Sequence, residues 1–298
     1  MKTARIAFAL LASLGLVAAA HAQELTGTLK KIKDTGTITL AVRESSIPFS
    51  YYDNQQNTIG YSYDIALQIV DAVKKDLGLA QLAVKRIPVT PANRIQLIQN
   101  GTVDLECGST TNNTARQKQV DFSDTIFIIG TRLLVNRSSG IKDFADLAGK
   151  NVVTTAGTTS EEILRKMNEE KKMGMHLISA KDHGESFLTL QSGRAVAFMM
   201  DDALLYGERA KARNPSDWIV VGTPQSKEAY GCMLRKGDAP FKKLADATIA
   251  RIETSGEAAK LYHKWFQSPI PPKGLNLDFP MSEDVVELYT HPNDKAFQ

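Results

Sequence analysis

The chain has 298 residues and a formal net charge of +3 at pH 7. This length corresponds to one large domain or two small ones, with enough apolar residues for a substantial core. The basic residues form no block and do not alternate with aromatic residues, so nucleic acid is a poor candidate partner.

The first 22 residues have the composition of a secretory signal peptide. Lys2 and Arg5 give a positive start, residues 6–20 form a short apolar run, and residues 20–22 (Ala-His-Ala) have the small-x-small pattern of a signal-peptidase site. The apolar run is too short for a comfortable membrane span. We therefore expect cleavage after Ala22 and a mature chain that is exported in soluble form.

The sequence contains two cysteines, Cys107 and Cys232. In the oxidising compartment that an exported protein enters, a disulfide between them is the expected state. The alternative is a pair of separate buried thiols, because disulfide formation depends on a Cα separation that the sequence does not reveal.

Residues 37–107 alternate between strand-like and helix-like patterns. Apolar residues alternate in the strands and recur every four residues in the first long helix, for example at Ile65 and Ile69. The order β-α-β-α-β is typical of an open parallel sheet. The predicted segments are strand 37–42, helix 62–77, strand 81–87, helix 93–99 and strand 103–107.

Basic and small polar residues follow each of these strands. Arg43 comes after the first strand, Arg94 starts the helix after the second, and residues 109–116 come after the third. Ligands of open α/β sheets bind beyond the carboxyl ends of the strands, so these positions should converge on one edge. Small hydroxyl residues followed by Arg116 suit an anion. For an isolated Ser-Thr-Thr run, the alternative is a capped surface turn.

A second α/β unit follows a long β-rich run at residues 126–135. Thr159 and Glu162 fit a capping box at the start of its first helix, and Asp201 ends one of its strands. Two β runs cross between the units, near residues 127–132 and 225–230, so the second unit is inserted in the first. The remaining predicted segments are strands 151–155, 177–180, 195–200, 218–221 and 229–234, helices 184–192, 204–212, 241–252 and 256–266, and a polar tail with a short helix after Ser282.

Several sequence blocks resemble the solute-binding proteins of polar amino-acid ABC importers, most of all the glutamate/aspartate-binding members. The similarity extends over essentially the whole mature chain. It implies the type II periplasmic-binding fold, an α/β fold of two lobes in which each central sheet is flanked by helices. Lobe 1 would comprise residues 23–130 and 229–298, and lobe 2 residues 131–228. The blocks begin at Gly108 (Gly-Ser-Thr-Thr-Asn-Asn), Arg43 (Arg-Glu-Ser-Ser-Ile-Pro-Phe), Gly157 (Gly-Thr-Thr-Ser-Glu), Met199 (Met-Met-Asp-Asp) and Tyr230 (Tyr-Gly-Cys-Met-Leu-Arg-Lys).

The resemblance implies a periplasmic receptor that closes two lobes over L-glutamate or L-aspartate. The receptor would hand its ligand to the membrane permease of an ABC importer, and we expect it to be a monomer without a cofactor. The ligand has one ammonium and two carboxylates, and each must be paired when the lobes exclude water.

Each ligand charge has candidate partners at the strand ends. We expect Asp201, supported by Ser109 and Thr111, to bind the ammonium, although an aspartate before a helix is equally typical of an N-cap. The α-carboxylate is assigned to Arg116 and Thr159. The side-chain carboxylate is assigned to Arg43 and Arg94, with His183 beside them. The alternatives are a surface salt bridge of Arg43 with Glu44, an exposed Arg94 and a structural His183.

Nothing in the sequence indicates an enzyme. It contains no Gly-x-Ser-x-Gly motif, no phosphate-binding loop and no His/Cys metal spacing. The competing hypothesis from another class is a cyclohexadienyl or arogenate dehydratase on the same fold, which would need an acid or base at the leaving group of its substrate. A soluble sensory role is the third hypothesis.

Overall fold

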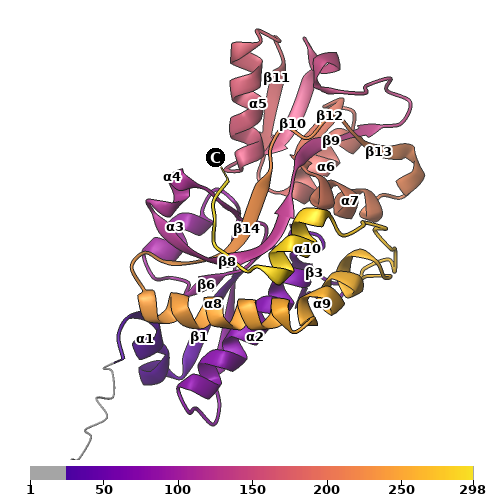
Figure 1. Cartoon of the computed structure of the whole chain (residues 1–298). Coiled ribbons are helices and arrows are strands. Elements are labelled where there is room, and N and C mark those ends of the chain that lie inside the picture. Colours follow the sequence, from indigo (N-terminus) through magenta and orange to yellow (C-terminus); the bar gives the residue numbers. More distant parts are fainter. Residues whose placement is uncertain (1–24, 298) are drawn as a thin grey trace, which may run out of the picture.

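The computed structural model describes residues 25–297 as two lobes (Figure 1), so the predicted signal peptide and its cleavage site lie outside the described residues. We call the part around a six-stranded sheet lobe 1. Its strand order is β5-β1-β6-β14-β7, with β8 also paired to β14. The strands are β1 (Thr37–Val42), β5 (Ala83–Pro88), β6 (Leu105–Glu106), β7 (Thr111–Asn112), β8 (Val120–Ile129) and β14 (Glu228–Arg235).

The β-α-β-α-β pattern predicted for residues 37–107 is confirmed. Strand β1 pairs in parallel with both β5 and β6, while β14 is antiparallel to its neighbours. Lobe 1 also contains a small antiparallel sheet of β2 (Ser45–Ser46), β3 (Ser50–Tyr52) and β4 (Thr58–Ile59). The helices of lobe 1 are α1 (Gly27–Thr35), α2 (Tyr61–Asp76), α3 (Arg94–Gln99), α4 (Thr114–Gln117), α8 (Ala239–Thr254), α9 (Glu257–Phe266) and α10 (Glu283–Thr290).

We call the part around the five-stranded sheet lobe 2. Its strand order is β11-β10-β12-β9-β13, in which β10 is parallel to β11 and β12. The strands are β9 (Thr131–Asn136), β10 (Asn151–Thr155), β11 (His176–Ala180), β12 (Ala197–Asp201) and β13 (Trp218–Val221). The helices are α5 (Thr159–Glu170), α6 (His183–Gln191), α7 (Asp202–Lys211) and two short 3-10 turns, Phe144–Leu147 and Pro215–Asp217.

The chain passes between the two sheets twice. The long β run predicted at residues 126–135 is divided at Gly130, with β8 in one sheet and β9 in the other. The return passage runs through residues 222–227 into β14. The passages lie side by side, because the Gln225 N–H donates to the Thr131 carbonyl at 3.0 Å. A Cβ at Gly130 would lie only 3.0 Å from the Ser226 carbonyl oxygen, which explains the glycine.

Strand β14 is held in lobe 1 by a disulfide and by aromatic packing. Cys107 and Cys232 are bonded, which confirms the expected pair. The ring of Tyr230, also on β14, lies 5.2 Å from that of Phe49, and Phe49 in turn packs edge-on against Phe127. These contacts set the position of the residues at the start of β14, which lie where the lobes meet.

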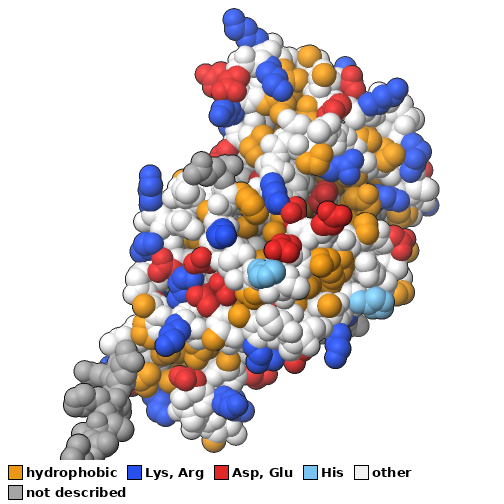
Figure 2. Space-filling view, in the orientation of Figure 1, with side chains coloured by type: hydrophobic (Ala, Val, Ile, Leu, Met, Phe, Trp, Pro, Cys, Tyr) orange, Lys and Arg blue, Asp and Glu red, His pale blue; other side chains and the backbone are white. Residues whose placement is uncertain are grey.

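The outer surface carries charges of both signs. On the face shown in Figure 2, acidic and basic side chains are interspersed over both lobes. Among residues 25–297, no helix is long and apolar enough to cross a membrane.

One acid is buried inside lobe 1 without a partner. Glu253 on α8 is 4% exposed, and neither carboxyl oxygen has a hydrogen-bond partner among the described residues. Burial, assisted by the negative charge of Asp124, raises the pKa of Glu253 to about 9. The folded protein therefore keeps a proton that the unfolded chain releases at a much lower pH.

This proton makes the free energy of unfolding depend on pH. Between about pH 4.5 and 9, the contribution of Glu253 should fall by up to about 1.4 kcal/mol per pH unit as the pH rises. Glu253→Gln removes this titration. As the pH rises from 5 to 8, the free energy of unfolding of the variant should therefore increase relative to that of the parent. Denaturant titrations at both pH values measure this gain. Glu287→Gln, at an exposed site, is the control, and parallel pH profiles for parent and Glu253→Gln would contradict the prediction.

Candidate ligand-binding site

All eight side chains that the sequence analysis selected are buried where the lobes meet. The most exposed, Thr159, is only 8% exposed. Hydrogen bonds connect them across the boundary, including Arg43 to His183 at 3.4 Å and Arg116 Nη2 to the Gly157 carbonyl at 3.3 Å. Lobe 1 contributes Arg43, Arg94, Ser109, Thr111 and Arg116, and lobe 2 contributes Thr159, His183 and Asp201.

The fold places these residues at the carboxyl ends of parallel strands. In lobe 1, Arg43 directly follows β1 and Ser109 follows β6. In lobe 2, Thr159, His183 and Asp201 follow or end β10, β11 and β12. The carboxyl edges of the two sheets, where open α/β sheets bind their ligands, therefore face each other.

A buried carboxylate lies beneath the first two arginines. The Arg94 Nη1 atom donates to the Ser109 carbonyl at 3.0 Å and lies 4.0 Å from Glu106 Oε1. Burial lowers the pKa of Arg94 to about 9 and lowers that of Arg43, and Glu106 opposes both shifts. Two guanidinium groups thus share one carboxylate, which leaves one positive charge without a counter-charge in this group.

The hydrogen bonds of His183 define its tautomer. Its Nε2 faces the Arg43 guanidinium, which can only donate, so Nε2 is the acceptor. The proton is therefore on Nδ1 and is donated to the Thr155 hydroxyl at 2.9 Å. Burial and the nearby cations keep the pKa of His183 well below its usual value. His183 is a neutral residue that orients Arg43 from the opposite lobe.

Arg116 also connects the lobes. The Asn113 side chain caps α4 by accepting the Arg116 N–H at 2.9 Å. The guanidinium then donates to the Thr111 carbonyl at 3.0 Å in lobe 1 and to Gly157 in lobe 2. Arg116 is also close enough to Arg94 for its positive charge to contribute to the lowered pKa of Arg94.

The predicted capping box at Thr159 is wrong by one residue. The N-cap of α5 is Thr158, whose hydroxyl accepts the Glu161 N–H at 3.2 Å. Three consecutive hydroxyl residues, 158–160, offer alternative caps that the pattern alone does not distinguish. Because Thr158 is the cap, the Thr159 hydroxyl is free to donate to Glu228 Oε2 at 2.7 Å.

Asp201 occupies the N-cap position of α7, but its side chain makes no cap hydrogen bond. Its carboxyl oxygens instead accept from the Ser160 hydroxyl at 3.2 Å and from the Tyr230 hydroxyl. The neighbouring Asp202 accepts the Ala203 N–H at 2.8 Å. Burial, together with the charge of Glu228, raises the pKa of Asp201 well above its usual value.

Sequence reasoning missed the two buried acids, Glu106 and Glu228. Each lies on a β strand at the lobe boundary, and each is at most 3% exposed. In the predicted strand 103–107, two acids, Asp104 and Glu106, alternate with apolar residues, and this alternation was the available signal for Glu106. Glu228 was assigned to the crossing, because the predicted strand began one residue later.

Glycines allow the lobes to approach backbone to backbone. A Cβ at Gly157, where φ is +76°, would lie 2.6 Å from the Ala92 Cα. A Cβ at Gly207 on α7 would collide with the Ile47 carbonyl of lobe 1. The Gly184 N–H donates to the Ser45 hydroxyl at 3.3 Å. The two lobes are therefore closed on each other.

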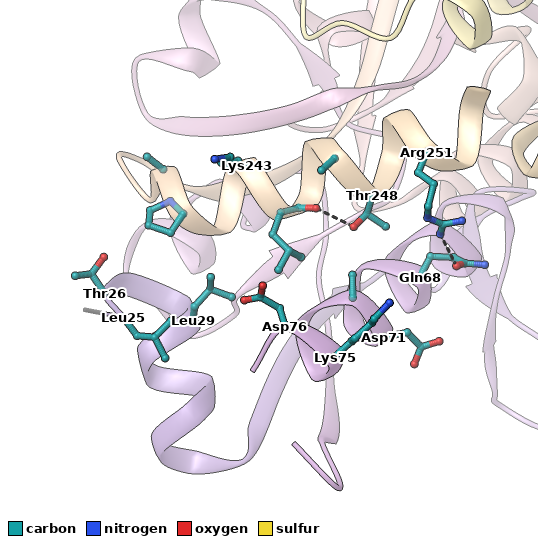
Figure 3. A pocket seen from close by; sticks show the side chains of 15 residues that line it. Leu25, Thr26, Leu29, Gln68, Asp71, Lys75, Asp76, Lys243, Thr248 and Arg251 are labelled. Atoms are coloured by element: carbon teal, nitrogen blue, oxygen red, sulfur yellow. Dashed lines mark hydrogen bonds between the residues drawn. The ribbon is translucent and has the colours of Figure 1, made fainter. Parts of the chain in front are cut away.

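A surface groove of about 1080 Å³ lies elsewhere, between α1, α2 and α8 of lobe 1 (Figure 3). Its lining mixes acids such as Asp71 and Asp76 with bases such as Lys75 and Lys243. Arg251 crosses it to reach Gln68 at 3.1 Å. None of the buried residues at the lobe boundary lines this groove.

Comparisons with known proteins agree with this architecture. Residues 38–268 match the family described as bacterial extracellular solute-binding proteins, family 3. The chain is 66% identical over 276 residues to the L-glutamate/L-aspartate-binding protein of Pseudomonas aeruginosa, covering 92% of this chain and 91% of that protein. It is 61% identical over 296 residues to the glutamate/aspartate import solute-binding protein of Escherichia coli, covering 99% and 98%.

A solved structure shares the fold. The ancestral amino acid-binding protein AncCDT-1, a precursor of cyclohexadienyl dehydratase, is 28% identical with a TM-score of 0.69, covering 80% of this chain and 99% of that chain. The expected type II periplasmic-binding fold is confirmed. The chain therefore belongs to the bacterial extracellular solute-binding proteins of family 3.

Proposed function

We propose that this protein is a periplasmic receptor that captures L-glutamate or L-aspartate and delivers it to the permease of an ABC importer. The names of its relatives support this ligand class. The observation that carries the proposal is the distribution of buried charge. One group has two guanidinium groups and one carboxylate, and a second has the carboxyls of Asp201 and Glu228. Arg116 is a third guanidinium group, which donates to carbonyl oxygens of both lobes.

An acidic amino acid offers an opposite charge to each of these groups. Its side-chain carboxylate would meet the unpaired positive charge of Arg43 and Arg94, and its ammonium would meet Asp201. Its α-carboxylate would meet Arg116 and the first N–H groups of α5, which have no partner within the helix. Each charge of the ligand would then be paired on losing its water.

Family membership favours a binding protein over the dehydratase hypothesis. The signal peptide and the permease would place the receptor in the periplasm, and we expect it to act as a monomer. Titration calorimetry with glutamate, aspartate, glutamine and asparagine tests the ligand class. Both acids should bind far more tightly than either amide, and a preference for glutamine would refute the proposal.

The role of Asp201 is tested with Asp201→Asn. The variant removes the charge opposite the ammonium and leaves a buried cation unpaired, at an expected cost of ~3–5 kcal/mol. The dissociation constant for glutamate should rise by roughly 10²–10³-fold. The control is Asp202→Asn, which alters the neighbouring acid at the start of α7. Parent-like affinity in Asp201→Asn would assign Asp201 a purely structural role.

The charge count at Arg43 and Arg94 gives a second prediction. Arg94→Gln leaves Glu106 to neutralise Arg43, so the preference for glutamate over glutamine should shrink by about 10²-fold. Adding Glu106→Gln restores one positive charge and should restore part of that preference. Calorimetric titration of both ligands against the single and double variants measures the effect.

Arg116→Gln is the matched variant at the third arginine. Because every amino acid carries an α-carboxylate, it should weaken glutamate and glutamine by the same factor. Equal weakening of both ligands by Arg94→Gln would contradict the assignment of Arg94 to the side-chain carboxylate.

We also propose that the two side-by-side passages form a hinge, so that ligand shifts the lobes from open to closed. Gly207→Ala should oppose closure because the added methyl meets the Ile47 carbonyl. Small-angle scattering should show a smaller ligand-induced decrease in radius of gyration, with weaker binding. Leu188→Ala, on the exposed face of α6 in the same lobe, is the control. An unchanged radius on adding ligand to the parent would refute the hinge.

A further inference from the structure

The hydrogen bonds of Glu228 suggest a role that the ligand contacts proposed above do not include. We infer that Glu228 sets the direction of the Thr111 and Thr159 hydroxyl groups, so that both accept from the ligand ammonium and neither donates to a ligand carboxylate. This inference rests on the proposed function and assigns Glu228 as a specificity-determining residue of the same site.

The contacts of Glu228 span both lobes. Its Oε2 accepts from the Thr159 hydroxyl of lobe 2 at 2.7 Å and from the Thr111 hydroxyl of lobe 1. Its Oε1 accepts from the Ser226 hydroxyl at 3.0 Å. The side chain is buried at the start of β14, a strand held by the disulfide and the aromatic packing. The carboxylate is therefore held in place from three sides.

The chemistry of these groups determines where the protons lie. A hydroxyl has one proton and two lone pairs, and an ionised carboxylate has no proton to donate. Thr111 and Thr159 must therefore each direct their proton at Glu228. Their oxygens, which lie 3.4 Å apart, then offer only lone pairs to any further group.

Two neighbouring lone pairs suit an ammonium and repel a carboxylate. An ammonium has three donors and no acceptor, so these hydroxyl groups and Asp201 would together receive all three of its protons. Burial, and after it the negative charge of Glu228, raise the pKa of Asp201, so a cation near both carboxyl groups would offset their repulsion.

This arrangement divides the proposed role of Thr159 between two atoms. The hydroxyl would accept from the ammonium, whereas the backbone N–H at the start of α5 would remain available to the α-carboxylate. The sequence analysis assigned the whole residue to the α-carboxylate. A ligand without an ammonium should therefore be rejected, because it leaves two buried acceptors and a buried acid unpaired.

The test compares L-glutamate with glutarate, which has the same two carboxylates but no ammonium. Glu228→Met removes the acceptor of both threonine hydroxyl groups, so that their protons are free to turn toward the ligand. Calorimetry should show glutamate weakened by roughly 10–100-fold and glutarate unchanged or tighter. Thr159→Val should likewise weaken glutamate and not glutarate, whereas Thr159→Ser should retain the preference of the parent for glutamate over glutarate.

Two outcomes would overturn the inference. Equal weakening of both ligands by Glu228→Met would make Glu228 only a contact between the lobes, and unchanged glutamate binding in Glu228→Met would show that Glu228 does not affect specificity. The thermal unfolding midpoint of Glu228→Met, compared with that of the parent at the pH of the titrations, controls for general destabilisation. The proposed function is tested separately, by the ligand preference of the parent protein. If the parent binds another amino acid, that amino acid and its deaminated counterpart decide the inference in the same way.

Discussion

Charges buried between two lobes must be neutralised within a few ångströms, and most features of this structure serve that requirement. Removing a guanidinium or a carboxylate from water is costly unless a partner is already in place. Arg43 and Arg94 share Glu106, and Arg116 is held by carbonyl oxygens from both lobes. The site is therefore preorganised by protein groups, while an excess of positive charge remains where an acidic side chain would lie.

The backbone supports this arrangement in two ways. Parallel strands in each lobe end at the boundary, so residues distant in sequence meet there with their side chains directed at the opposite lobe. Glycines at 157 and 207 remove the side chains that would keep the two backbones apart. Close approach of the lobes excludes water, and exclusion of water strengthens the interactions between the charges.

The hydroxyl groups of the site differ from its charged groups in their hydrogen bonding. A carboxylate and a guanidinium each have a single hydrogen-bonding role, whereas a hydroxyl takes the role that its neighbours leave to it. His183 follows the same rule, because the guanidinium of Arg43 determines which ring nitrogen carries the proton. Neighbouring side chains thus determine whether each hydroxyl oxygen or imidazole nitrogen of the site acts as donor or acceptor.

The sequence by itself determined the order of strands and helices, the convergence of Arg43, Arg94 and residues 109–116, and the family resemblance. These depend on periodicity and on residue type at strand ends, which are local properties. Only the tertiary structure decided the cap of α5 and the partners of Glu106 and Glu228. For Glu228 the physical reason is sequence distance, because it accepts hydrogen bonds from two threonines that are 69 and 117 positions away. A local sequence pattern does not predict the direction of a hydroxyl proton, because that direction depends on a carboxylate that lies nearby only in the folded protein.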